Sequence, residues 1–257
     1  MTQPFTYRLD YRFPIAVVRM CGTLSPSTAP VARTALLESL VEEPTSVIVD
    51  LAGVTAADDV AVQVFPGAAV QAAGWPGAAV LLCAPRNAVA EALARGSVSS
   101  QLPVHDAFSD ALAIAAADPV PRRMQERLGP TVHAPRLARE LVAEACHAWG
   151  LPDRAIAAEV IASELVTNAV RHAGTSMELR VTLRDEQLRI SVRDGVDQPA
   201  RMQTPTESDD HGRGRLIVDA VASAWGNVTV GDGKVVWASL RVPPERNHEL
   251  VQAGEEN

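Results

Sequence analysis

Lysine is nearly absent from this sequence, and aromatic residues, cysteines and long apolar runs are scarce. Lys234 is the only lysine, so arginine carries nearly all of the positive charge, and the net charge is −8. This balance gives no general attraction to nucleic acid or to anionic membranes. No run of about 18 apolar residues exists that could span a bilayer, and the N-terminus lacks the charged-then-apolar pattern of a secretory signal. We therefore expect a cytoplasmic protein that binds neither nucleic acid nor membrane.

The cysteines exclude a disulfide framework and a cysteine-based metal site. There are 3 of them, Cys21, Cys83 and Cys146. They lie far apart in the chain, are odd in number and show no metal-ligand spacing. We expect them to be small core residues in a reducing compartment.

The first half of the chain alternates strand-like and helix-like segments with short links. At 257 residues the chain is long enough for one large domain or two ordinary ones. The expected elements are two strands within 5–19, helix 25–41, strand 46–51, helix 59–73, strand 78–83, helix 85–95, strand 102–104 and helix 108–117. This alternation predicts an α/β layer architecture. Two prolines after Asp118 indicate a boundary there.

The second half has fewer but more strongly patterned segments. The expected elements are strand 122–128, helix 135–149, a helix from 153 to 173, strands 177–183 and 187–194, helix 216–225, and a hairpin of 228–230 and 235–241. Apolar residues alternate in the strands, which indicates a sheet with one face covered by helices. Residues 196–211 are polar and form a long loop of the kind that is usually a lid or disordered.

The stretch 158–173, AEVIASELVTNAVRHA, carries the strongest functional signal. At about 100° per residue, Glu164, Asn168 and His172 fall within roughly an 80° sector of a helix, which they share with Ile161 and Leu165. Polar groups are thus predicted on the apolar stripe, while residues 159, 163 and 167 form the opposite, solvent-facing side. Burying these three groups without partners would cost several kcal/mol, so something polar must meet them.

Two interpretations of this helix stay open from the residues alone. In the first, it is a core helix whose polar side chains bond to neighbouring backbone. In the second, they meet a ligand and a metal ion. An amide oxygen beside a carboxylate suits Mg²⁺, which proteins tend to share with substrate phosphates.

A second motif, Gly212-Arg213-Gly214-Arg215, precedes the predicted helix from 216. Glycines ahead of a helix let backbone N–H groups approach phosphates, and the helix terminus adds a favourable field. Alone this pattern is weak evidence, because glycines occur there for simple turn reasons.

In this order, the motifs resemble the nucleotide site of the GHKL ATPase superfamily, in the form found in anti-sigma factor serine/threonine kinases. The resemblance implies a GHKL-type α/β sandwich with helices layered on a mixed sheet, and a site for ATP and Mg²⁺. It implies that Asn168 is the metal ligand and Glu164 the catalytic base. The other implied nucleotide-binding residues are His172, then Asp194 and Gly195 at the adenine base, and Gly212, Arg213, Gly214 and Arg215 at the phosphates.

The first half is similar to STAS domains, the fold of anti-sigma factor antagonists. The similarity rests on the order of elements and on the segment 49–58, VDLAGVTAAD. In antagonists this segment leads to a phosphoacceptor serine, where this sequence has Asp59. Asp59 either mimics a permanently phosphorylated antagonist or, with Asp58, merely caps a helix.

These resemblances imply a regulator of a partner-switching system. We expect a STAS-like domain at 1–118, a linker at 119–126, a GHKL ATPase-like domain at 127–245 and an acidic tail at 246–257. The expected activity is a protein serine/threonine kinase that phosphorylates a STAS antagonist, and the expected partners are that antagonist, a sigma factor or both. The alternative is a non-catalytic, nucleotide-dependent binding switch. Asp59 favours it, and so do Val196-Asp197, which stand where the family usually has a second glycine after the aspartate. Relatives of the second half form dimers through that domain, so this chain could also form a homodimer.

Overall fold

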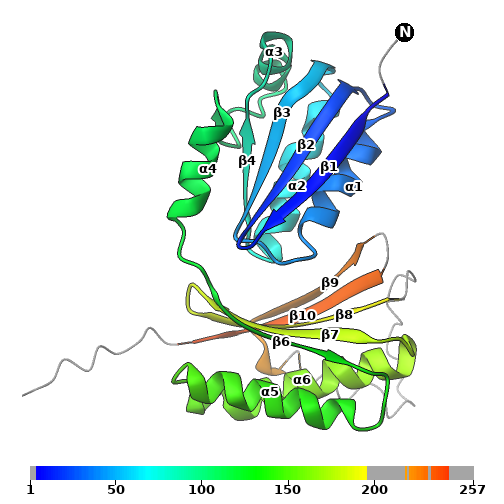
Figure 1. The fold of residues 1–257 in the computed structure, drawn as a ribbon, viewed down its shortest axis with the longest axis vertical. Helices are drawn as coiled ribbons and strands as arrows, with labels where there is room; N and C mark the ends of the chain where they lie inside the picture. Colours follow the sequence, from blue (N-terminus) through cyan, green and yellow to red (C-terminus); the bar gives the residue numbers. More distant parts are fainter. Residues whose placement is uncertain (1–3, 196–217, 219, 231–232, 243–257) are drawn as a thin grey trace, which may run out of the picture. The chain divides into compact units, whose positions relative to one another are not determined.

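A twisted sheet of five strands organises the first part of the chain (Figure 1). The structure is a computed structural model that describes residues 4–195, 218, 220–230 and 233–242. The chain divides into two compact units, and the main break lies between Pro121 and Arg122. None of the helices in these described ranges is long and apolar enough to cross a membrane.

The first unit alternates strands and helices as predicted. Its elements are β1 (Thr6–Arg12), β2 (Ile15–Leu24), α1 (Ala29–Ser39), β3 (Ser46–Ala57), the 3₁₀ turn η1 (Ala61–Gln63), α2 (Val64–Gly74), β4 (Ala79–Cys83), α3 (Asn87–Arg95), β5 (Val104–His105) and α4 (Phe108–Ala117). The strands lie in the order β1-β2-β3-β4-β5. β1 pairs antiparallel with β2, and the remaining neighbours are parallel.

The parallel strands of this sheet are buried, as their apolar runs predict. Helices α1 and α2 lie behind the sheet in Figure 1, and α4 packs on a cluster that includes Val17, Ile48 and Leu81. β3 is longer than the predicted strand 46–51, because pairing with β2 continues through Ala57. The segment that resembles the STAS motif therefore lies along β3 and ends at the loop after it.

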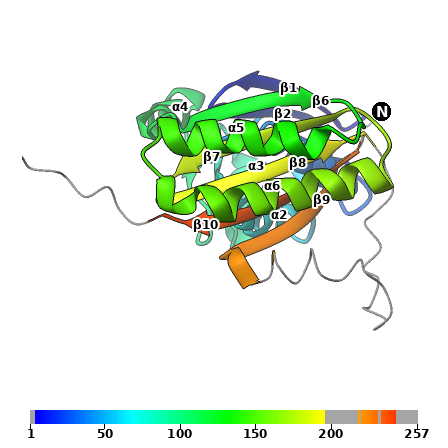
Figure 2. The ribbon, with the colours of Figure 1, turned by 90° about the horizontal axis from the view of Figure 1, so that it is seen from below.

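The second unit is a five-stranded sheet with helices on one face. Assigned by membership of this sheet, its described elements are β6 (Arg122–Leu128), α5 (Ala134–Ala148), α6 (Pro152–His172), β7 (Met177–Arg184), β8 (Gln187–Asp194), β9 (Ala224–Val230) and β10 (Gly233–Arg241). The strands lie in the order β6-β7-β8-β10-β9. Figure 2 shows α5 and α6 side by side across this sheet.

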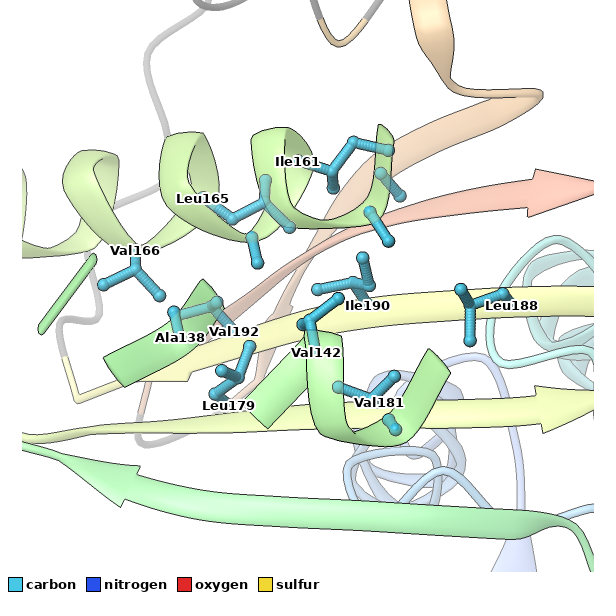
Figure 3. Close-up of a cluster of buried hydrophobic side chains, with 14 of the residues drawn as sticks. Ala138, Val142, Ile161, Leu165, Val166, Leu179, Val181, Leu188, Ile190 and Val192 are labelled. Atoms are coloured by element: carbon cyan, nitrogen blue, oxygen red, sulfur yellow. The ribbon is translucent and has the colours of Figure 1, made fainter. Parts of the chain in front are cut away.

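The core of this unit lies between the sheet and the two helices. Alternate residues of β7 and β8 face α5 and α6, and the labelled side chains of Figure 3 interdigitate there. The labelled set is Ala138, Val142, Ile161, Leu165, Val166, Leu179, Val181, Leu188, Ile190 and Val192. The helix-covered sheet predicted from the alternation is confirmed.

Two predicted boundaries need correction. The expected linker 119–126 is shorter in the structure, because residues 122–126 belong to β6, which pairs with β7 in the second sheet. The predicted helix 216–225 ends too late, because β9 already begins at Ala224. Within this stretch, the Ala222 N–H donates a helical hydrogen bond to the Val218 carbonyl at 2.8 Å. The expected acidic tail 246–257 lies outside the described residues.

The cysteines divide into one exposed and two buried thiols, so the prediction of core cysteines is wrong for Cys21. Burial, with a smaller contribution from the Asp50 charge, raises the pKa of the Cys83 thiol to about 12. Burial, and then the Glu159 charge, raises the pKa of the Cys146 thiol to about 11.

Thiol labelling should follow this division. The thiolate is the reactive form, and a raised pKa keeps the thiol protonated to higher pH. At pH 8 we expect a maleimide to modify Cys21 alone in the folded chain, and all three thiols in denaturant. The modified residues can be counted by intact-mass spectrometry, with Cys21→Ser as the control. Rapid labelling of folded Cys21→Ser would contradict the expectation.

Candidate functional site

The candidate site lies along the C-terminal half of α6. Pro152 is the first residue of this helix. Proline is suited to this position, because a backbone N–H in the first turn has no partner within the helix. The helix ends at His172, and Gly174 adopts a positive φ of 61°, a backbone conformation that favours glycine. The sequence therefore fixes both ends of the helix that carries Glu164, Asn168 and His172.

The polar trio borders the buried stripe of α6 and does not lie within it. Ile161 and Leu165 are buried, whereas Glu164 is half-buried and Asn168 and His172 are exposed. The prediction that all three are lodged in the apolar flank is wrong in this respect. The buried stripe is centred on small and aliphatic residues about a quarter turn away: Ala158, Ile161, Ala162, Leu165, Val166 and Ala169.

The side of α6 predicted to face solvent is half-buried against α5. Arg139 of α5 donates a hydrogen bond from Nη1 to the Ser163 Oγ at 2.9 Å. Glu159 and Thr167 are also half-buried. Sequence reasoning missed this pairing, because the two residues are 24 positions apart and nothing in their local pattern links them. The bond joins α6 to α5 at the residue immediately before Glu164.

Asp194 and Asn168 lie toward the same end of the second unit. In Figure 3, Ile161 lies toward Leu188 and Ile190, and Val166 lies toward Val192, so α6 and β8 run in the same direction. Asp194 ends β8 and is 2% exposed. Both C-terminal ends thus lie on one side of the domain, with Gly195 exposed directly after Asp194.

The remaining predicted site residues are not described. Gly212, Arg213, Gly214 and Arg215 lie outside the described residues, as do residues 196–211 between the two motifs. The structure therefore brings together α6 and the end of β8, and leaves the predicted phosphate-binding segment as an expectation.

The donor groups around α6 suit a metal shared with a nucleotide, not a protein cage. Among the residues that the structure describes, no group of three or more histidines, cysteines or acidic residues could hold a metal ion. Asn168 instead offers a single exposed amide oxygen, with the Glu164 carboxylate one helical turn before it. Mg²⁺ is usually held by one or two protein oxygens together with phosphates and waters. The residues present therefore fit Mg²⁺ bound with ATP.

In the first unit, Asp58 and Asp59 have different partners. The Asp58 Oδ1 accepts hydrogen bonds from the backbone N–H groups of Val60 and Ala61 at 2.8 and 3.2 Å. The Asp59 Oδ2 accepts one from Arg95 Nε at 2.8 Å. Asp58 thus bonds the backbone that leads into η1, whereas Asp59 makes an ion pair with Arg95 of α3. Sequence reasoning missed Arg95, which lies 36 positions from Asp59.

Comparison with known families assigns both units. A family model described as "Histidine kinase-like ATPase domain" matches residues 129–240, and the STAS domain model matches residues 10–111. The chain joins a STAS domain to a histidine kinase-like ATPase domain. The fold class and the family resemblance expected from the sequence are confirmed.

Several solved structures resemble parts of this chain at low sequence identity. An anti-sigma factor antagonist from Mycobacterium paratuberculosis is 18% identical, with 45% of this chain and 99% of that chain covered and a TM-score of 0.41. A putative anti-sigma factor antagonist from Thermotoga maritima is 13% identical, with 43% and 94% covered and a TM-score of 0.37. The histidine kinase domain of a blue-light activated histidine kinase from Erythrobacter litoralis is 18% identical, with 60% and 87% covered and a TM-score of 0.31. A search of the curated proteins found no match.

This pairing of domains fits a partner-switching regulator, and the histidine kinase-like ATPase domain implies that the chain binds ATP.

Proposed function

We propose that the chain is an ATP-dependent protein serine/threonine kinase of the anti-sigma type, which phosphorylates a serine on a separate STAS antagonist. The observation that carries this proposal is the shared end of α6 and β8. There the half-buried Glu164 and the exposed Asn168 lie on a helix that packs on the strand ending at the buried Asp194. The residues lie within the match to the ATPase family model.

Each residue would have a separate role in the reaction. Asp194 would accept a hydrogen bond from the exocyclic amino group of adenine, and Gly195 would leave room for the base. Asn168 would hold Mg²⁺ through its amide oxygen, and the metal would neutralise charge on the phosphates. Gly212 and Gly214 would present backbone N–H groups to the phosphates, with Arg213 and Arg215 adding charge-assisted bonds. His172 would lie at the edge of the nucleotide.

Glu164 would act on the attacking hydroxyl. It would orient the serine Oγ and take its proton as the bond from Oγ to the γ-phosphorus forms and the bond from that phosphorus to the ADP oxygen breaks. Phosphoryl transfer depends mostly on positioning and on charge neutralisation, so a carboxylate and a metal ligand on one rigid helix are suitable. The substrate serine must come from another protein, because the chain's own STAS domain has Asp59 at this position.

The alternative is a non-catalytic switch that binds nucleotide and holds a sigma factor or an antagonist. Val196-Asp197 directly after the Asp194-Gly195 pair favours it, because Asp197 adds negative charge near the expected phosphates. Pairing of two chains through the second domain stays a prediction for both functions.

Phosphoryl transfer can be tested directly. The full chain is incubated with γ-³²P-ATP, Mg²⁺ and a serine-bearing STAS protein, beside the same STAS protein with its serine changed to alanine. We expect label on the serine form alone, and none when EDTA removes Mg²⁺. Nucleotide binding without label on any STAS protein would support the switch. Absence of nucleotide binding would refute both functions.

A further inference from the structure

The loop between β3 and α2 places Asp59 next to the end of α3. Asp58 already satisfies the first free backbone donors of the following helical segment, at Val60 and Ala61. The Asp59 side chain is therefore not needed as a cap. It is 45% exposed and meets the Arg95 side chain, which is 55% exposed.

A hydrogen bond and close backbone packing hold the end of α3 against this loop. Gln63 donates a hydrogen bond from Nε2 to the Gly96 carbonyl at 2.6 Å. A Cβ on Gly96 would lie 2.9 Å from the Asp59 carbonyl oxygen and 2.7 Å from the Val62 Cγ2, so the two segments are in close contact. Arg95 is therefore held beside Asp59 by the fold and does not reach it by chance from a free helix end.

The ion pair changes what the Asp59 carboxylate presents to a partner. Hydrogen bonding to Arg95 lowers the pKa of Asp59, so the carboxylate is ionised, and the bound guanidinium offsets its charge. A phosphoserine would carry about −1.5 to −2 charges at this position. Glu91 lies 3.6 Å from Arg95 Nη1 and is a more distant contact. Beside the pair, the Val60 side chain is 72% exposed.

This inference rests on the proposed function. We propose that the Arg95 guanidinium masks the negative charge of Asp59. A partner ATPase domain would then recognise this STAS domain as an unphosphorylated antagonist and not as a mimic of the phosphorylated form. Arg95 is then the residue that determines how position 59 is recognised. The STAS domain would occupy such an ATPase without ever being phosphorylated at this position. The first domain would thus compete with other STAS antagonists for the ATPase. This role replaces the interpretation of Asp59 as a mimic of phosphoserine.

The ion pair itself can be tested in the full chain without a partner. The side-chain carboxyl of Asp59 is titrated by NMR in the wild type, in Arg95→Gln and in Arg95→Lys. We expect a lowered pKa in the wild type, a return toward the ordinary aspartate value in Arg95→Gln, and partial retention in Arg95→Lys. Glu91→Gln, which removes the more distant contact, is the matched control and should leave the lowered value in place. An Asp59 pKa that Arg95→Gln does not raise would overturn the proposal.

Recognition is tested with a purified single-domain histidine kinase-like ATPase of the anti-sigma type, loaded with Mg-ADP. Masking predicts that Asp59→Asn changes the affinity of the full chain for this probe by less than about 2-fold, and that Arg95→Gln weakens it about 5-fold. The double variant Asp59→Asn/Arg95→Gln should restore binding, because no unmasked charge remains. Tighter binding by Asp59→Asn alone would show an exposed charge and overturn the proposal.

The two proposals fail in different ways. Lack of binding by every variant would refute this type of partner for the STAS domain, while ATP binding and phosphoryl transfer by the second domain are measured separately. Loss of transfer activity would refute the kinase and leave the result of the Asp59 titration intact.

Discussion

Replacement of Asn168 by alanine is expected to weaken Mg²⁺-dependent ATP binding by roughly 100-fold or more. Asn168 is the predicted protein ligand of the metal, and a lost ligand removes charge neutralisation worth several kcal/mol at the phosphates. Glu164→Gln should behave differently. It should leave ATP affinity within about 3-fold and lower the rate of phosphoryl transfer by about 10²- to 10⁴-fold, as expected for a general base.

Calorimetric titration with ATP, with and without Mg²⁺, measures the first effect, and single-turnover transfer to a serine-bearing STAS protein measures the second. Asp153→Asn is the matched control, since Asp153 is exposed on the first turn of the same helix. It should change neither quantity. Equal losses of binding in Asn168→Ala and Glu164→Gln would contradict the separate roles, and an unchanged transfer rate in Glu164→Gln would exclude it as the base.

Replacement of Ile161 by alanine should have the largest effect on stability. Ile161 is 0% exposed between α6 and the second sheet. Truncating a buried isoleucine removes apolar contacts and leaves a cavity, at a cost of about 2–5 kcal/mol in the free energy of unfolding. Ile156 on the same helix is 80% exposed, so Ile156→Ala should change stability by less than about 0.5 kcal/mol.

Hydrogen exchange read by mass spectrometry can assign this loss to one domain. Peptides from α6 and β8 should lose protection in Ile161→Ala, while peptides from β2 and β3 should keep theirs. Equal stability of the two alanine variants would contradict the packing described for α6. An equal loss of protection in both domains would show that they unfold as one unit.

Periodicity and turn residues predicted most of the fold. The bounds of β6, α4 and β8 agree with the predicted segments, because a proline, a glycine or a charged turn lies at or near most of their ends. β3 was predicted too short, since its last residues are polar or small and are held in the strand by pairing with β2. Backbone pairing between distant segments leaves no local signal in the sequence.

The candidate site was predicted in part. The helical positions of Glu164, Asn168 and His172 follow from the sequence, but their exposure does not. A helical wheel places residues within a sector of the helix, whereas the neighbours of that helix determine which sector is buried. Here α5 covers the side with Ser163, which shifts the buried stripe away from the trio. Arg95 could not have been found at all, because its role depends on the packing of α3 near Asp59.

The position of β6 determines where the two halves of this chain can be cut apart for expression. β6 supplies the outermost strand of the second sheet and starts at Arg122. A fragment starting at residue 127, where the sequence boundary was drawn, would keep only the last two residues of that strand. The fragment would leave β7 with unpaired backbone groups along its length, and such an edge promotes aggregation. Truncation ahead of residue 122 retains the whole sheet and is the better choice for a separate ATPase domain.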